Sequence, residues 1–245
     1  MNIFEHVGRY SILMRRTLTK PDKWKIFFRQ YKLELEKLGV DSIGIVAIIS
    51  VFIGAVIVTQ TILNTDNPIL PKYTPGLVAR DTILLEFSSS IIALILSGKI
   101  GSSIASEIGT MRITEQIDAL DIMGVNSANY LILPKIAAMV TMIPCLVTIS
   151  MFVGVGGGYL VAIGGLISAN QYTLGIQYAF VPFYVVYSYV KSFFFAFIIV
   201  SVASYYGYYA YGGTLEVGKA STNAVVKSCA VVLFANVILT QLMLV

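Results

Sequence analysis

The sequence predicts an all-α integral membrane protein with five transmembrane helices. An N-terminal interfacial amphipathic helix precedes them, and a short helix lies between the second and third spans. Composition is the first observation behind this prediction, because 57% of the 245 residues are hydrophobic and 12% are charged. A soluble domain carries about 25% charged residues. The second observation is that the apolar residues gather in long, charge-poor runs, and a helix of about 20 such residues crosses a bilayer.

Residues 1–40 form the N-terminal segment. Pro21 suits a first helical turn, and after it apolar side chains recur at helical spacing with basic residues around them. The apolar members of this pattern are Trp24, Phe27, Phe28, Tyr31, Leu35 and Leu38. The pattern predicts a basic amphipathic helix in the headgroup plane of the membrane. Packing of the same helix on another subunit is the alternative, and both can hold.

Residues 41–245 form the transmembrane domain, with predicted spans at about 42–65, 82–105, 131–165, 181–206 and 226–245. The second span is the weakest, since it holds Glu86 and Lys99. The third and fourth spans come from one long charge-free run that the turn-forming residues 168–173 divide. Gly154 and Gly158 in the third span allow close helix packing, either within the chain or in a dimer.

Basic residues set the predicted orientation. Nine lysines and arginines precede the first span, which places the N-terminus in the cytoplasm. Five spans then place the C-terminus on the periplasmic side, and they place the segments 107–128 and 207–227 in the cytoplasm. The N-terminal residues lack the apolar core and cleavage site of a signal peptide.

The segment 101–124 (GSSIASEIGTMRITEQIDALDIMG) is the predicted functional site. Thr114 can cap a short helix, Glu115 suits its first turn, and Gly124 can end it. An amphipathic helix of two to three turns between spans is the kind of element through which an ABC transporter receives force from its ATPase. A solvated acidic loop is the alternative. The residues predicted to couple to an ATPase are Glu107, Arg112, Glu115, Gln116, Ile117, Asp118 and Leu120.

Other functional classes fit less well. The stretch 213–220 approximates a phosphate-binding loop, but Ala220 stands where a hydroxyl is required. We therefore expect no catalytic, metal or cofactor site in this chain, with ATP and magnesium bound by a partner ATPase. A secondary transporter or channel for a small hydrophobic solute is the runner-up. Such proteins show paired repeats and several charges at the bilayer midplane. An intramembrane enzyme would need motifs that the sequence lacks.

The stretch from Gly98 to Leu120 resembles the signature of MlaE/YrbE-type permeases, G-x-x-G-[SA]-x-[IL]-A-x-E-[IL]-G-x-M-x-[IV]-x-E-Q-[IV]-D-A-[IL]. The residues in register are Gly101, Ala105, Glu107, Gly109, Met111, Glu115, Gln116, Asp118 and Ala119. The resemblance continues through Asp121–Gly124, Pro134 and the stretch 216–226, and it covers roughly residues 25–245.

This resemblance implies the permease subunit of an ABC transporter, a non-catalytic homodimer in a bacterial inner membrane. Its implied partners are an ABC ATPase subunit, an MCE-domain protein on the outer face and, in many systems, a STAS-domain subunit. The implied cargo is phospholipid that moves between the inner and outer membranes. No nucleic acid is expected as a partner.

Two further groups of residues are predicted to lie near the cargo. Glu86 and Lys191 lie in spans that enter from the same face, and their distances from the span ends place them at comparable depth. An unpaired charge there costs a few kcal/mol, so we expect a salt bridge near the substrate cavity. Separate snorkelling of each charge is the alternative. The aromatic residues Tyr184, Tyr187 and Phe194 are predicted to line a lipid cavity, with simple packing as the alternative.

Overall fold

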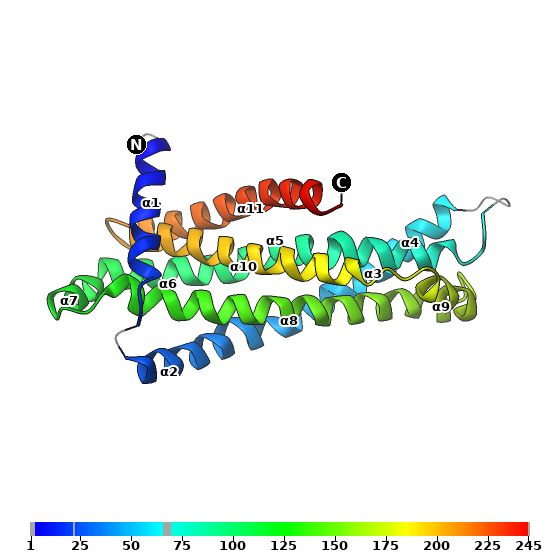
Figure 1. Ribbon diagram of the computed structural model, residues 1–245, viewed down its shortest axis with the longest axis horizontal. Coiled ribbons are helices and arrows are strands. Elements are labelled where there is room, and N and C mark those ends of the chain that lie inside the picture. The colour runs from blue at the N-terminus through cyan, green and yellow to red at the C-terminus, as the bar shows by residue number, and fades with distance from the viewer. Residues whose placement is uncertain (1–2, 22, 66–69, 245) are drawn as a thin grey trace. The chain divides into compact units, whose positions relative to one another are not determined.

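The computed structural model describes residues 3–21, 23–65 and 70–244, and within these ranges the regular structure is helical with no strand (Figure 1). The elements, in chain order, are α1 (Ile3–Thr17), α2 (Trp24–Glu34), η1 (Leu35–Gly39), η2 (Val40–Ser42), α3 (Ile43–Asn64), α4 (Thr74–Thr82), η3 (Ile83–Ile91), α5 (Ile92–Leu96), η4 (Ser97–Gly101), α6 (Ser102–Ile113), α7 (Gln116–Ile122), α8 (Ser127–Ile163), α9 (Ala169–Gln177), α10 (Phe183–Tyr208) and α11 (Thr214–Leu244). The turns η1, η3 and η4 are π-helical, and η2 is a 3₁₀ turn.

Five helical runs among the described residues are long and apolar enough to cross a membrane, which confirms the predicted fold class. They are Trp24–Asn64, Thr74–Ile113, Ser127–Ile163, Phe183–Tyr208 and Thr214–Leu244. Each run covers one predicted span to within two residues at either end and, in most cases, extends beyond it by a turn or more at the other. Val245, where the fifth predicted span ends, lies outside the described residues, and so do residues 66–69 of the loop after the first span.

The N-terminal segment differs from the prediction in its connections. The helix α2 continues through η1 and η2 into α3, so no loop separates the amphipathic stretch from the first span. Nothing in residues 35–42 breaks the helix. The stretch contains no proline, and its single glycine, Gly39, packs close to the side chain of Met142. The separate N-terminal helix is instead α1, which the sequence analysis did not foresee.

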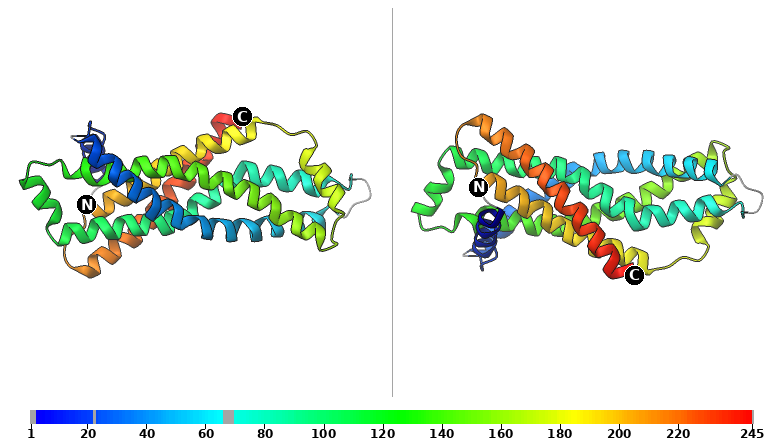
Figure 2. Two further views of the ribbon diagram at one scale, coloured as in Figure 1. Left: turned by 90° about the horizontal axis from the view of Figure 1, so that it is seen from below. Right: turned by 90° about the horizontal axis from the view of Figure 1, so that it is seen from above.

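The chain forms two compact units, and the first comprises residues 1–41, 93–143 and 193–245. In this unit α11 packs along α6, where the side chain of Val217 lies against Gly109. Gly207 of α10 lies directly on the backbone of Ala105. Helix α1 runs across the other helices of the unit, and Figure 2 shows it nearly end-on. With 15 residues, α1 is shorter than the about 20 residues with which a helix crosses a bilayer.

The second unit comprises residues 42–92 and 144–192. Its core contains Ile57, Val58, Ala79, Ile83, Ala162 and Tyr172. The glycines of α8 let helices approach closely, since a Cβ at Gly157 would overlap the backbone of Val51. Gly154 faces Gly54 of α3, and Gly158 lies beneath the ring of Tyr172. The glycine pair predicted in the third span therefore serves packing within the chain.

A buried arginine fixes the segment that follows α9 in this unit. The guanidinium of Arg80, 3% exposed, donates hydrogen bonds to the carbonyl oxygens of Ile176 (2.8 Å) and Tyr178 (2.7 Å). It also pairs with Asp81 at 2.7 Å. These bonds satisfy the carbonyls that a helix leaves free at its C-terminal end.

Candidate functional site

The predicted coupling helix is present as α7, and a sharp turn at Glu115 separates it from α6. Glu115 has φ 60° and ψ 12°, the left-handed conformation that few non-glycine residues adopt. The predicted cap at Thr114 needs correction, because the Thr114 hydroxyl donates to the carbonyl of Thr110 instead of capping α7. The turn is held by the backbone, where the amide of Glu115 donates to the carbonyl of Arg112 at 3.2 Å.

The end of α7 agrees with the prediction that Gly124 terminates it. Gly124 has φ 73°, and its amide donates to the carbonyl of Asp121 at 3.0 Å. The amide of Val125 donates to the carbonyl of Leu120 at 3.0 Å. This is the bonding pattern by which a left-handed glycine closes a helix.

The two faces of α7 differ in exposure. Ile117 has no exposed surface and packs against the rest of the chain. Its side chain therefore cannot make the expected contact with the ATPase in this structure. Glu115 and Gln116 are exposed, while Asp118 and Leu120 are partly buried. At the far end Ile122 and Met123, which the sequence analysis did not name, are 86% and 68% exposed. The surface that α7 presents is thus acidic at its start and apolar at its tip.

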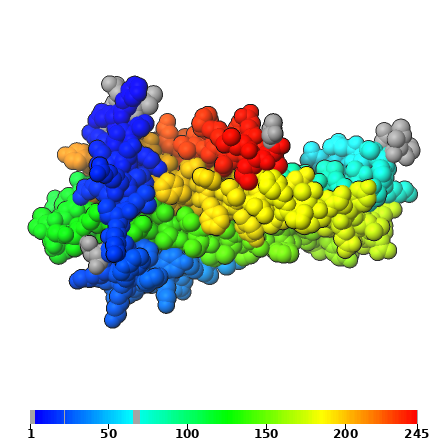
Figure 3. Space-filling model, in the orientation of Figure 1, coloured from blue at the N-terminus to red at the C-terminus, as the bar shows by residue number. Residues whose placement is uncertain are grey.

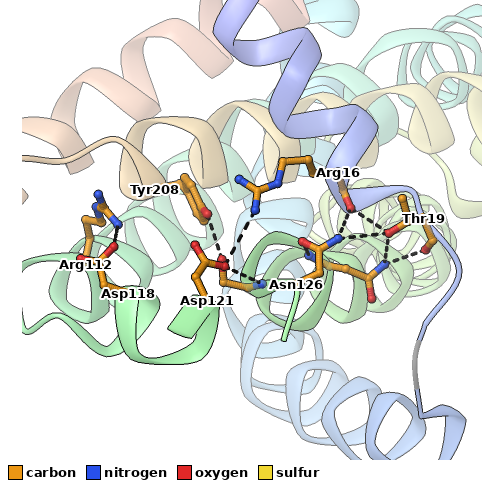
Figure 4. Close-up of polar contacts among 9 residues, drawn as sticks. Arg16, Thr19, Arg112, Asp118, Asp121, Asn126 and Tyr208 are labelled. Atoms are coloured by element: carbon orange, nitrogen blue, oxygen red, sulfur yellow. Dashed lines mark hydrogen bonds and ion pairs between the residues drawn. The ribbon is translucent and has the colours of Figure 1, made fainter. Parts of the chain in front are cut away.

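An ion pair joins the start of α7 to the end of α6. A guanidinium nitrogen of Arg112 lies 2.6 Å from a carboxylate oxygen of Asp118 across the turn at Glu115 (Figure 4). Asp118 also lies in the first turn of α7, where the helix dipole favours a negative charge. The pair fixes the angle between the two helices, so two of the predicted coupling residues support one another.

Glu107 lies about two turns before this bend, and its carboxylate is paired within the chain. Its carboxylate accepts from Lys37 at 2.7 Å and from Lys135 at 3.0 Å, and Lys135 pairs in turn with Glu34. Lys135 is 3% exposed, so its charge depends on these two carboxylates. The network joins α6 to α8 and to the helix before the first span. The structure therefore gives Glu107 a bracing contact, which the sequence could not show because its partners are 70 and 28 residues away.

Two asparagines hold the C-terminal end of α1, one in the turn after α7 and one in the first turn of α8. The amide group of Asn126 donates to the carbonyl of Arg16 at 2.9 Å, and that of Asn129 donates to the carbonyls of Thr17 (2.9 Å) and Thr19 (2.6 Å). We call these contacts the asparagine clasp (Figure 4). The sequence offered one signal for it, because Asn126 caps α8 by accepting from the amide of Asn129 at 3.3 Å.

Two side-chain contacts extend the clasp to neighbouring helices. Arg16 lies 3.8 Å from Asp121 of α7, and the hydroxyls of Ser127 and Tyr208 share a hydrogen bond of 2.9 Å (Figure 4). The exposed ion pair adds at most about 1 kcal/mol. The hydrogen bonds of the two asparagines therefore hold α1 beside α7 more firmly than this ion pair does, while the bond between Ser127 and Tyr208 joins α8 to α10.

In the second unit the structure brings Glu86 and Lys191 together. The lysine nitrogen lies 3.0 Å from the carboxylate of Glu86, 3.0 Å from the hydroxyl of Tyr187 and 4.6 Å from the centre of the Tyr187 ring. Ser90 donates to the second oxygen of Glu86 at 2.8 Å. The Lys191 side chain is fully buried while that of Glu86 is 41% exposed, so the carboxylate marks the open side of the pair. A role of this pair near cargo stays a prediction.

The aromatic residues predicted to line a cavity differ in exposure. Tyr187 has no exposed surface and packs under the ion pair, so its predicted place on a cavity wall needs correction. Tyr184 is partly buried, and Phe194 is 52% exposed. A spacing pattern shows that these residues share a helix, but it does not show which side of the helix the neighbouring elements cover.

A groove of about 420 Å³ lies elsewhere in this unit, along α3. Phe52 and Val56 make one part of it apolar, and Gln60 and Asn64 make the other part polar. Phe87, the neighbour of Glu86, lies on the opposite wall. None of these residues stands out in the sequence, since α3 carries no charge that would distinguish one of its sides.

Comparison with known proteins decides the family. The model of the family "Permease MlaE" matches residues 33–242. The chain belongs to the MlaE permease family. A probable ABC transporter permease of Rickettsia bellii is 34% identical over 244 residues, which cover 99% of this chain and 93% of that protein. The intermembrane phospholipid transport system permease MlaE of Haemophilus influenzae is 27% identical over 245 residues, covering 99% and 94%.

A third relative comes from a plant. The chloroplastic protein TRIGALACTOSYLDIACYLGLYCEROL 1 of Arabidopsis thaliana is 30% identical over 221 residues, which cover 89% of this chain and 63% of that protein. The chain is thus a multi-pass ABC transporter permease of the MlaE family, a family of lipid transport. A permease of this kind is a non-catalytic membrane subunit, and it works with a partner ATPase.

Proposed function

We propose that this permease moves phospholipid between the inner and outer membranes and that its ATPase binds at α7. The observation that carries the proposal is the geometry of α7, which is anchored by the buried Ile117 and exposes Ile122 and Met123. Exposed apolar side chains beside a braced acidic surface are typical of a site for another protein. The brace of Arg112 and Asp118 lets a force on α7 act on α6 without bending the turn.

The proposed assembly follows the family. The permease is a homodimer in a bacterial inner membrane, with an MCE-domain protein on its outer face and, in some systems, a STAS-domain subunit on the ATPase. The N-terminus and α7 lie on the cytoplasmic side, and the C-terminus lies on the periplasmic side. The nine basic residues before the first span support this orientation.

The groove along α3 is the proposed surface for cargo. Phe52 and Val56 offer an apolar wall to an acyl chain, and Gln60 and Asn64 offer hydrogen bonds to the polar end of the lipid. A ligand site of this kind is mostly apolar with a few polar groups that fix orientation. Glu86 directly precedes Phe87 in η3, and its carboxylate is partly exposed. We therefore include Glu86 in the proposed cargo surface.

The test is a charge reversal at α7 in vesicles that contain the permease with its ATPase. We expect Asp118→Lys to keep ATP hydrolysis but to lower lipid movement at least tenfold, because the surface that meets the ATPase changes sign. Circular dichroism checks that the helices remain. Normal transport with normal stimulation of the ATPase by Asp118→Lys would mean that α7 is not the point of coupling.

A second variant separates partner contact from internal bracing. The exchange Arg112→Asp with Asp118→Arg restores the ion pair but keeps the charge at position 118 reversed. We expect this double variant to remain uncoupled. If the exchange restores transport, Asp118 acts through its pair with Arg112, and the proposed contact with the ATPase is wrong.

A further inference from the structure

A groove of about 520 Å³ lies in the first unit between α1, α10 and α11. Its walls are apolar and aromatic, with Val7 and Tyr10 from α1, Phe197 from α10 and Val231 from α11. The space-filling view shows α1 crossing beside the chain segments of α10 and α11 (Figure 3). Helices α10 and α11 are both long and apolar enough to cross a membrane, so we expect the groove to open toward lipid.

One cation faces this groove without a counter-charge. Lys227 of α11 lines the groove and is exposed, and within residues 3–21, 23–65 and 70–244 it makes no hydrogen bond or ion pair. It lies 13 residues into α11, which is about 20 Å along the helix. The predicted fifth span begins at about residue 226, so Lys227 lies near its cytoplasmic edge, where a lysine reaches the phosphate of a headgroup.

The other polar groups of the groove are already bonded to one another. A ring nitrogen of His6 and the hydroxyl of Tyr205 share a hydrogen bond of 2.8 Å, and the hydroxyl of Tyr10 donates to Ser201 at 2.9 Å. The described residues that line the groove include no carboxylate. The groove therefore offers an apolar wall and a single positive charge.

We propose that this groove binds an anionic phospholipid of the bilayer, with one acyl chain along the apolar wall and the phosphate on Lys227. A lipid brings an apolar chain and a negative group in one molecule, which matches both features of the site. It is a resident lipid rather than cargo, so the proposal does not depend on which lipid the permease moves.

A second copy of the chain fits this groove less well. In a two-fold contact both copies use the same patch, and the described residues that line this groove include no carboxylate that could neutralise the partner's Lys227. The acid of α11 is Glu216, and it pairs with Lys219 at 2.6 Å. The structure thus favours lipid over protein as the occupant.

The position of the groove links a bound lipid to the coupling segment. One wall is α1, and the asparagine clasp holds the end of α1 beside α7. A lipid that fills the groove therefore holds α1 against α10 and α11 while the clasp holds its other end. The lipid composition around the permease can in this way alter the support of α7.

The experiment measures which lipid occupies the groove. The variant Phe197→Trp in a Trp24→Phe background places the single tryptophan of the chain on the groove wall. This protein is reconstituted in vesicles that contain brominated phosphatidylglycerol or brominated phosphatidylcholine, and quenching of the tryptophan reports the lipid in contact. We expect about a fivefold preference for phosphatidylglycerol, which corresponds to about 1 kcal/mol for one lysine.

Two charge variants complete the test. In Lys227→Gln the preference should disappear, whereas Lys219→Gln on the same helix should keep it because Lys219 already pairs with Glu216. Equal quenching by both lipids in the parent protein overturns the proposal, as does a preference that survives Lys227→Gln. Quenching by neither lipid would mean that protein covers the groove. The comparison of two lipids uses one protein, so a folding defect in Lys227→Gln leaves the test decisive.

Discussion

The ion pair of Glu86 and Lys191 makes an asymmetric prediction about stability. The variant Glu86→Gln leaves a fully buried ammonium group that keeps its bond to Tyr187 but loses its carboxylate. Removing one partner of a buried pair costs about 3–5 kcal/mol. Because the Glu86 side chain is 41% exposed and the site is not fully dry, we expect about 3 kcal/mol.

The opposite variant should cost much less. Lys191→Met leaves a carboxylate that Ser90 still bonds and that can reach water or headgroups, and methionine fills the buried volume. We expect a loss of about 1 kcal/mol. The double variant contains no charge at either position, so it should also lose about 1 kcal/mol instead of the sum of about 4. The pair is thus coupled by about 3 kcal/mol.

The assay is the free energy of unfolding in mixed micelles titrated with SDS, followed by circular dichroism. Equal losses in the two single variants would refute the asymmetry, and additive losses in the double variant would show that the charges act apart. Lipid movement tests the functional side. Glu86→Lys and Lys191→Glu should each impair transport, and the exchange of both should restore part of it.

Two further predictions concern backbone positions. Gly157→Ala should destabilise the permease by about 1–3 kcal/mol in the same unfolding assay, because its methyl group overlaps Val51. The neighbouring Gly156→Ala, which faces open space, is the matched control and should be neutral or slightly stabilising. Glu115→Gly should stabilise the turn before α7 by about 1 kcal/mol by relieving a left-handed residue, and a loss of stability in this variant would contradict that reasoning.

The sequence predicted the elements better than their surroundings. Charge-poor apolar runs located the five spans, since a bilayer-crossing helix needs length and apolarity before anything else. Gly124 correctly ended α7, because a left-handed glycine is a local signal. Burial was harder to foresee. Ile117 and Tyr187 lie on the covered sides of their helices, and which side is covered depends on packing that spacing alone does not encode.

Contacts between distant residues were the least predictable. Glu86 and Lys191 could be paired because two charges in apolar spans need partners and their depths agree. Lys135, by contrast, lies in a proline-containing stretch that gave no reason to expect two carboxylates around it. Helix α1 was missed for a related reason. Its inward side combines the buried Leu13 and Met14 with polar contacts such as His6 to Tyr205, so no plain apolar repeat marks it in the sequence.

The asparagine clasp has a consequence for how these permeases can diverge. Asn126 and Asn129 bind carbonyl oxygens of residues 16, 17 and 19, and every residue type supplies a carbonyl. Outward side chains of α1 can therefore change from lineage to lineage without loosening its attachment. The family model begins at residue 33, after α1, yet both asparagines lie inside it. The outward side of α1 can thus be adapted to a new membrane or partner with no change in the two asparagines that hold it.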